Sequence, residues 1–119
     1  MTNEAKCFSD ILRHHGFDII SVLCKNGSIE KSYIGIGDEN KIEGQCDEIM
    51  CNPIGQALLL NEHNTDFNVI LGLCVGHDTL VMKYLKAPMT TLAVKDRVTG
   101  HNPLVALYLS DSYYKRKLY

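Results

Sequence analysis

The sequence predicts one α/β domain spanning residues 1–119, a Rossmann-like layered fold in which helices flank a small, mainly parallel sheet of about three strands. Two observations predict this fold. Helix-periodic stretches and short β-rich stretches alternate along the chain, and an Asn-Pro pair opens two of the helical stretches. Right-handed crossovers between parallel strands would bring the carboxyl ends of the strands to one rim, where ligands bind in such folds.

The first part of the chain contains a helix, a strand and a weakly patterned stretch. Residues 3–15 carry apolar side chains at helical spacing, and Gly16 follows them as a typical helix stop. The run FDIISVLC, 17–24, is closed by the turn sequence KNG and is predicted to be a buried strand. Glycines and mixed charges predict a loop over 28–45, with a short turn of helix around 29–34.

The rest of the chain alternates more regularly. Asn52 is expected to cap a helix of about three turns that has Pro53 at its first position. The run FNVILGLC, 67–74, predicts the second strand. The remaining predicted elements are a helix over 79–86 that ends before Ala87-Pro88, a third strand over 89–96, and a last helix capped by Asn102 with Pro103 in its first turn.

The composition argues against several classes of protein. With 45% hydrophobic and 22% charged residues, the chain is globular and not a disordered tail. A net charge of −2 and the lack of a basic stripe argue against nucleic acid as a partner. No apolar run reaches the ~20 residues of a membrane span, and MTNEAKCF is no signal peptide. We therefore expect a cytoplasmic protein, in which cysteines are thiols or metal ligands more often than disulfides.

Three cysteines fall on the predicted rim. Cys24 and Cys74 end the first two strands, and Cys51 directly precedes a helix that must start at the same rim. Thiolates select zinc or iron–sulfur clusters, so the three predict a shared metal site, with Cys46 as a candidate fourth ligand. The alternative is that each is a buried core cysteine, as free cysteines often are. Cys7 lies in the first helix, away from the rim, and is expected to be structural.

Polar side chains at the same rim are candidates for substrate binding. Lys95 and Arg97 follow the third strand and could bind an anion, although a salt-bridged turn explains them equally well. His77 and His101 each follow a glycine and precede the polar residues Asp78 and Asn102. Loop histidines can act as ligands or proton shuttles, but they also commonly hydrogen-bond a neighbouring loop. The candidate substrate-binding set is His77, Asp78, Lys95, Arg97 and His101.

The segments MCNPIGQALLLN, GLCVGHD and KDRVTGHNP occur in an order and with gaps that resemble a numbered domain-of-unknown-function family. The family is described as cysteine-rich metal-binding proteins of anaerobic bacteria and archaea, with cytosolic α/β members of unestablished role. The resemblance implies that Cys24, Cys51 and Cys74 are the family cysteines and that Cys7 and Cys46 lie outside the pattern. Typical members carry an extra strand and a cysteine-bearing segment before the residues that match 4–16. This chain is expected to lack both, which leaves the fourth thiolate ligand open.

Two functions of different class follow. One is a metal-binding protein with a thiolate site for zinc or an iron–sulfur cluster, where Lys95, Arg97 and His77 orient a small anionic or sulfur-containing molecule. The other is a metal-free thiol, redox or small-molecule-binding domain, in which a helix N-terminus activates Cys51 or Cys74. The sequence does not identify catalytic residues or decide whether the chain is an enzyme.

The predicted sheet also has a consequence for assembly. The strand 17–24 has little to prevent edge pairing, and a small parallel sheet should be covered on both faces. We therefore expect a homo-oligomer, most simply a homodimer, or else a partner chain, which buries apolar surface near the first helix or along this edge.

Overall fold

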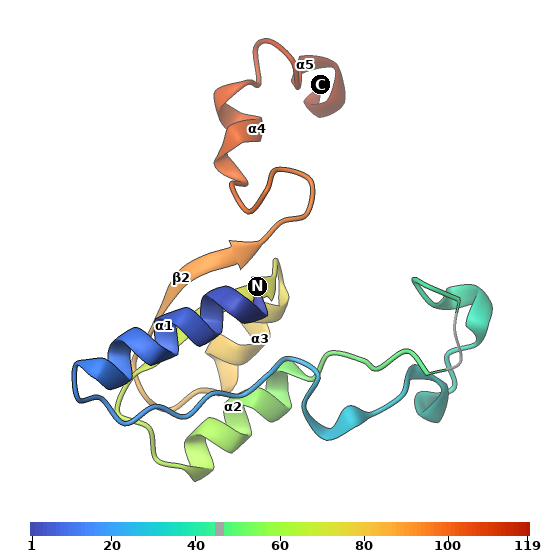
Figure 1. Ribbon diagram of the computed structural model, residues 1–119. Coiled ribbons are helices and arrows are strands. Elements are labelled where there is room, and N and C mark those ends of the chain that lie inside the picture. Colours follow the sequence, from blue (N-terminus) through green and yellow to red (C-terminus); the bar gives the residue numbers. More distant parts are fainter. Residues whose placement is uncertain (45–46) are drawn as a thin grey trace.

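The computed structural model describes residues 1–44 and 47–119, which form helices and strands in an α/β order (Figure 1). Short 3-10 turns occupy the stretch that the sequence predicted to be a loop, and one of them matches the expected helical turn around 29–34. The elements are α1 (Thr2–His14), η1 (Asn26–Ser28), η2 (Lys31–Ile34), η3 (Asp38–Asn40), α2 (Pro53–Glu62), β1 (Asn68–Cys74), α3 (His77–Tyr84), β2 (Met89–Lys95), α4 (Leu104–Tyr108) and α5 (Lys115–Leu118).

The sheet consists of β1 and β2 in parallel, connected through α3, within the part of the chain that is described. The register runs from Asn68 opposite Met89 to Cys74 opposite Lys95, so both strands end at the same rim. The α/β class is confirmed. Of the three expected strands, 67–74 and 89–96 are found, whereas the first strand, 17–24, and a Rossmann-like sheet are not found in residues 1–44 and 47–119.

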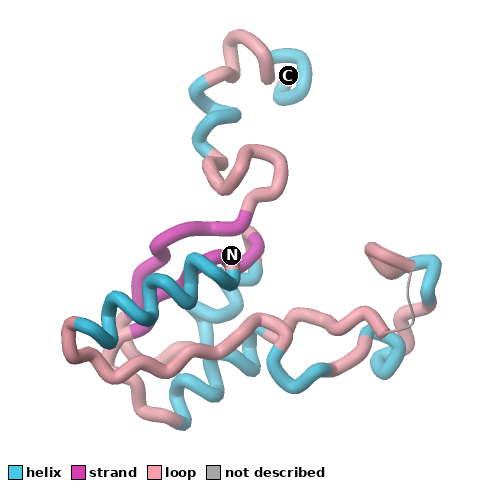
Figure 2. Tube along the Cα trace, in the orientation of Figure 1, coloured by secondary structure: helices cyan, strands magenta, loops and turns pink. Residues whose placement is uncertain are grey.

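The missing strand is the segment 17–24, predicted as the first strand, which is extended but joins no ladder in the described structure (Figure 2). Its carbonyl groups bond elsewhere. Arg13 Nη2 donates to Ile19 O at 3.3 Å, Gln56 Nε2 to Val22 O at 2.8 Å, and the amide of Asn52 to Cys24 O at 2.7 Å. Contacts with α1 and α2 therefore hold this segment, and the prediction of a strand was wrong.

Two helices follow the sequence signals closely. α1 ends where predicted. Gly16 follows it with a φ of 87°, a left-handed conformation that residues with a Cβ atom rarely adopt. The Gly16 amide bonds to Arg13 O at 3.0 Å and the Phe17 amide to Leu12 O at 3.1 Å, which closes the helix end. At the start of α2, the Asn52 side chain accepts from the Gly55 amide at 2.9 Å, as the Asn-Pro opening predicted.

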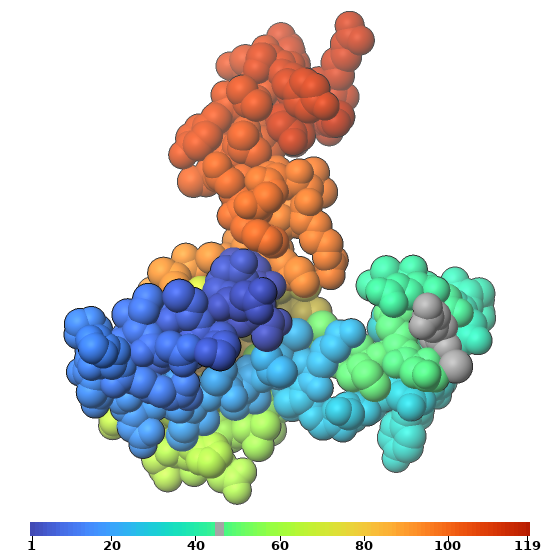
Figure 3. All heavy atoms as spheres, viewed as in Figure 1, coloured from blue at the N-terminus to red at the C-terminus, as the bar shows by residue number. Residues whose placement is uncertain are grey.

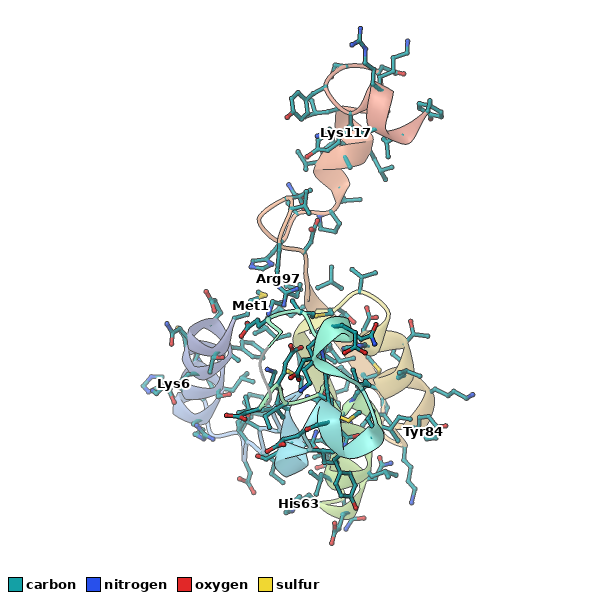
Figure 4. All side chains as sticks on the ribbon, turned by 90° about the vertical axis from the view of Figure 1, so that its right-hand side faces the viewer. Met1, Lys6, His63, Tyr84, Arg97 and Lys117 are labelled. Atoms are coloured by element: carbon teal, nitrogen blue, oxygen red, sulfur yellow. The ribbon has the colours of Figure 1, made fainter. Side chains whose placement is uncertain are left out.

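The core is small. Ala57 of α2, Ile70 and Leu73 of β1 and Val81 of α3 are the buried hydrophobic side chains of the described residues. α3 packs on β1 and α2 packs on α3, while α1 lies on the other side of the sheet (Figures 1 and 4). Cys24 packs against this cluster together with Leu85 and Met89.

Residues 104–119, which we name the arm, extend away from the body of the molecule (Figure 3). The sequence predicted one helix here with Asn102 as its cap. Instead α4 ends at Tyr108, α5 begins at Lys115, and Asn102 does not cap α4. Among the described residues, no helix is long and apolar enough to cross a membrane.

Candidate functional site

The position of Cys24 relative to Cys51 is set by two asparagines. Asn26 Nδ2 donates to Leu23 O at 3.1 Å and to Asn52 O at 2.9 Å, so it connects the turn after Cys24 to the start of α2. The Asn52 amide donates to Cys24 O at 2.7 Å from the other direction. We call these contacts the asparagine clamp, Asn26 and Asn52, and they hold the backbones that carry the two cysteines side by side.

Gly55 leaves the room that the clamp needs. A Cβ atom at this position would lie 2.4 Å from Asn52 Nδ2 and 2.6 Å from Asn26 Oδ1, well inside van der Waals contact. Any larger residue at position 55, in the first turn of α2, would therefore push the asparagine side chains apart.

Cys74 reaches the site from β1. The β1–β2 register shifts between Ile70 and Leu71 and again between Leu71 and Leu73, around Gly72 at a φ of 76°. A Cβ at Gly72 would meet the Met1 side chain at 2.8 Å. Such bulges redirect the side chains that follow them, and this one precedes the two last residues of the strand.

The three rim cysteines meet around Cys51. Both Cys24 and Cys74 lie near enough to the Cys51 thiol to act on its pKa. All three thiols are free and half-buried. Burial raises the pKa of the Cys51 thiol above its ordinary value of 9.0, because the thiolate loses hydration, and the neighbouring Cys24 and Cys74 raise this pKa further. Nearby Lys25 acts in the opposite direction but does not reverse the shift.

This result corrects one expectation. The start of α2 was expected to lower the pKa of Cys51 and favour its thiolate, but the net change is upward. A raised pKa keeps the thiol protonated at neutral pH unless something replaces the proton. In residues 1–44 and 47–119, no three His, Cys, Asp or Glu side chains are already arranged to hold a metal ion.

The other two cysteines differ from these three. Cys7 is exposed on α1, outside the cluster, and is not part of the hydrophobic core that a structural role would require. Cys46, the candidate fourth ligand, lies outside the described residues.

The predicted substrate-binding residues at the end of β1 are only partly available. Asp78 accepts hydrogen bonds from the Gly76 amide at 2.8 Å and the Thr79 amide at 2.9 Å, so it stabilises the turn into α3. His77 is half-buried as the first residue of that helix. Lys95 pairs with Cys74 in the sheet register, which puts a basic residue next to the cysteine cluster.

The residues after β2 form a tight turn. Asp96 Oδ1 accepts from the Val98 amide at 2.9 Å and from the Thr99 amide at 3.4 Å, and its Oδ2 accepts from the Thr99 hydroxyl. His101 Nδ1 accepts from the Asp96 amide at 3.1 Å, so this imidazole has a structural partner. The Thr99 hydroxyl, more than the backbone amides, holds the pKa of Asp96 below its ordinary value. Arg97 is exposed where the arm leaves the body (Figure 4).

Sequence reasoning missed the residues that support the cysteines. Asn26 belonged to the recognised turn KNG, and Gly55 and Gly72 to a helix and a strand, where they had no assigned purpose. A glycine inside a strand pattern is a usable signal for a bulge. The contact between Asn26 and Asn52 spans 26 positions, and no local pattern reveals it.

Comparison with known proteins gives a family and one relative. Residues 1–92 match the family described as "Protein of unknown function (DUF1847)", a range that contains Cys24, Cys51 and Cys74. The chain is 51% identical over 118 residues to "Uncharacterized protein MJ0455" of Methanocaldococcus jannaschii. That alignment covers 99% of this chain and 58% of the relative, so the chain spans less than two thirds of the relative's length. No solved structure matches.

Proposed function

The chain belongs to the DUF1847 family of unknown function, and we propose that its Cys24, Cys51 and Cys74 form a thiolate site for zinc or an iron–sulfur cluster. The observation that supports the proposal is the position of Cys51, whose neighbour Asn52 bonds to Cys24 O at 2.7 Å and whose thiol lies near enough to Cys24 and Cys74 for both to raise its pKa. Because the three come from separate parts of the chain, adjacency in the sequence does not explain their meeting.

The chemistry of the cluster supports a metal as the partner. Burial, together with the two neighbouring thiols, raises the pKa of Cys51, so this thiol keeps its proton in the metal-free site. Zinc and iron–sulfur clusters bind the thiolate and displace that proton, which removes the cost of a buried anion. Since the described side chains are not yet arranged as a ligand set, we propose that binding draws the cysteines together.

The surroundings suggest how such a site would be used. A metal held by three thiolates keeps one position open, where a fourth protein ligand or a small molecule can bind. Cys46 and His77 are the proposed fourth ligands. Lys95, opposite Cys74 in the sheet, and the exposed Arg97 would attract a small anionic or sulfur-containing ligand to the rim. We propose a cytoplasmic location, in keeping with the four free cysteines of the described residues.

The contact between Cys24 and Cys51 also favours a second candidate function, a reversible redox pair. The two thiols would form a disulfide, and their two electrons and two protons would pass to a disulfide or peroxide substrate. The raised pKa of Cys51 counts against this candidate, because the attacking species in disulfide exchange is the thiolate.

Anaerobic purification followed by metal analysis separates the two candidates. We expect the wild-type chain to retain zinc or iron in stoichiometric amount and Cys74→Ser to lose most of it. Cys7→Ser is the matched control, because Cys7 is exposed on α1 away from the cluster, and it should retain the metal.

The redox candidate predicts a different pattern. A metal-free wild-type chain that forms a Cys24–Cys51 disulfide with oxidised glutathione would contradict the metal site and support the redox pair. Equal metal content in Cys74→Ser and the wild type would exclude Cys74 as a ligand.

A further inference from the structure

A large groove separates α1 from the sheet. Its volume is about 800 Å³, and it lies between α1, the extended segment 17–24, α2 and β1. Apolar side chains line much of it, among them Phe8, Leu12, Phe17, Ile19, Val69 and Leu71. A parallel sheet is normally covered on both faces, so this groove is an apolar surface that the observed packing leaves uncovered.

The arm is the second uncovered apolar surface. Leu107 is 64% exposed, Tyr108 72% and Tyr113 70%, and the arm projects away from the body (Figures 1 and 3). It is nevertheless ordered within itself. The Tyr114 amide bonds to Leu109 O at 3.1 Å, and Lys117 Nζ lies 5.0 Å from the centre of the Tyr113 ring. A defined apolar unit of this kind is suited to docking as one piece.

The charges of the two surfaces are complementary. The chain has 12 basic and 14 acidic side chains, and the arm contains three of the basic and one of the acidic ones. The rest of the chain therefore has nine basic and 13 acidic side chains and a net charge of −4. The basic residues of the arm, Lys115, Arg116 and Lys117, are consecutive near its end. Two exposed acidic residues, Asp18 and Asp66, line the groove together with one basic residue, Lys95.

The turn that connects the arm to β2 directs the arm away from its own groove. Asp96 bonds to Val98 and Thr99, its amide donates to His101 Nδ1, and the His101 amide donates to Asp96 O at 2.8 Å. These bonds make residues 96–101 a structured turn and not a flexible linker. The arm therefore points outward, where a second molecule can accept it (Figure 4).

We propose that two copies of this chain exchange arms, so that the arm of each copy docks in the groove between α1 and β1 of the other. An exchange of this kind is closed and two-fold, and it forms the same contact twice. Each copy contributes the sixteen residues of its arm and the residues of its groove to the interface. Together these are more than the roughly 20–30 residues that each partner contributes to a standard interface. The proposal goes beyond the metal site and does not depend on it.

Light scattering of the purified full chain at micromolar concentration tests this proposal. We expect a dimer for the wild type and, for Leu107→Asp in the arm, a monomer whose dissociation constant for the dimer is raised about tenfold or more. Ile42→Asp is the matched control, because Ile42 is 83% exposed and lies outside both arm and groove, and it should remain dimeric. Circular dichroism should show the same helix content for all three proteins, since both substituted residues are exposed.

A mixing experiment identifies the two surfaces. Phe17→Asp, at a groove residue that is 60% exposed, should be monomeric with an intact arm, whereas Leu107→Asp retains an intact groove. Mixing these two variants should restore a heterodimer through one arm and one groove, weaker than the wild-type dimer. A monomeric wild type, a dimer that survives Leu107→Asp, or a mixture that stays monomeric would each overturn the proposal. Cys74→Ser should remain dimeric, so loss of the metal site and loss of the dimer are separate results.

Discussion

At the scale of single residues, the cysteine cluster depends on side chains that carry no reactive chemistry. Asn26 and Asn52 connect the turn after Cys24 to the start of α2, and Gly55 leaves room for them. The same region raises the pKa of Cys51 through burial and the other two thiols. Both features lead to predictions.

Gly55→Ala should disturb the asparagine clamp. The new Cβ would meet Asn52 Nδ2 at 2.4 Å, and relieving such overpacking costs about 1–3 kcal/mol of the free energy of unfolding. We also expect the metal content to fall, because Cys24 and Cys51 would move apart. Urea unfolding and metal analysis measure the two effects.

Gly37→Ala is the matched control for this substitution. A Cβ at Gly37 would meet only the end of the flexible Glu39 side chain, which can move aside. Its unfolding free energy and metal content should stay near those of the wild type. Equal effects of the two substitutions would contradict a specific role for Gly55.

The pKa of Cys51 predicts a reactivity profile. The thiolate reacts with iodoacetamide, so the alkylation rate of Cys51 in the metal-free chain should rise with pH and reach half its maximum above 9.0. In the urea-unfolded chain the midpoint should return to the ordinary value, because burial and the neighbouring thiols no longer act. Mass spectrometry of the Cys51 peptide measures both profiles. A folded-state midpoint below 9.0 would instead support an activated nucleophile.

At the scale of elements, the sequence predicted most of the helices and the two strands β1 and β2, but it wrongly predicted a strand over 17–24. Gly16 and the pair Asn52-Pro53 are local signals, and they identified the end of α1 and the start of α2. The segment 17–24 has a strand pattern, but strand pairing is decided by distant residues. Gln56 and Asn52 take the carbonyl groups of Val22 and Cys24, which no local pattern encodes.

The candidate site was predictable to a similar extent. Placing Cys24 and Cys74 at the ends of apolar runs was enough to expect a common rim with Cys51, and in the structure both lie near enough to Cys51 to raise its pKa. For His101 the sequence offered the alternative of a hydrogen bond to a neighbouring loop, which the structure shows, whereas the amide partners of Asp78 depend on turn geometry and were not predicted. The bulge around Gly72 was also missed, although its glycine was visible in the strand.

Hydrogen exchange should distinguish the extended segment from the true strands. Amides of residues 19–23 lack a ladder and should exchange much faster than those of the core positions Ile70 and Leu73 in β1. Mass spectrometry of peptides from the two segments gives the comparison. Equal protection of both segments would mean that 17–24 belongs to a sheet after all.

At the scale of the whole molecule, a small core carries two projecting parts. The radius of gyration is 16.9 Å, whereas a compact chain of this length has about 13.5 Å. The difference reflects the arm and the residues 25–44, which extend to one side of the body (Figure 1). Such a shape leaves apolar surface for a second molecule and keeps the cysteine rim on the compact part.

The central claim is that three cysteines from separate segments bind one metal. X-ray absorption at the metal edge of the anaerobically purified chain measures the ligands directly. For zinc we predict three sulfur neighbours at about 2.3 Å, or four where Cys46 is the fourth ligand, and one fewer around the metal that Cys51→Ser retains. A first shell of nitrogen and oxygen alone, or a sulfur count unchanged in Cys51→Ser, would contradict the claim.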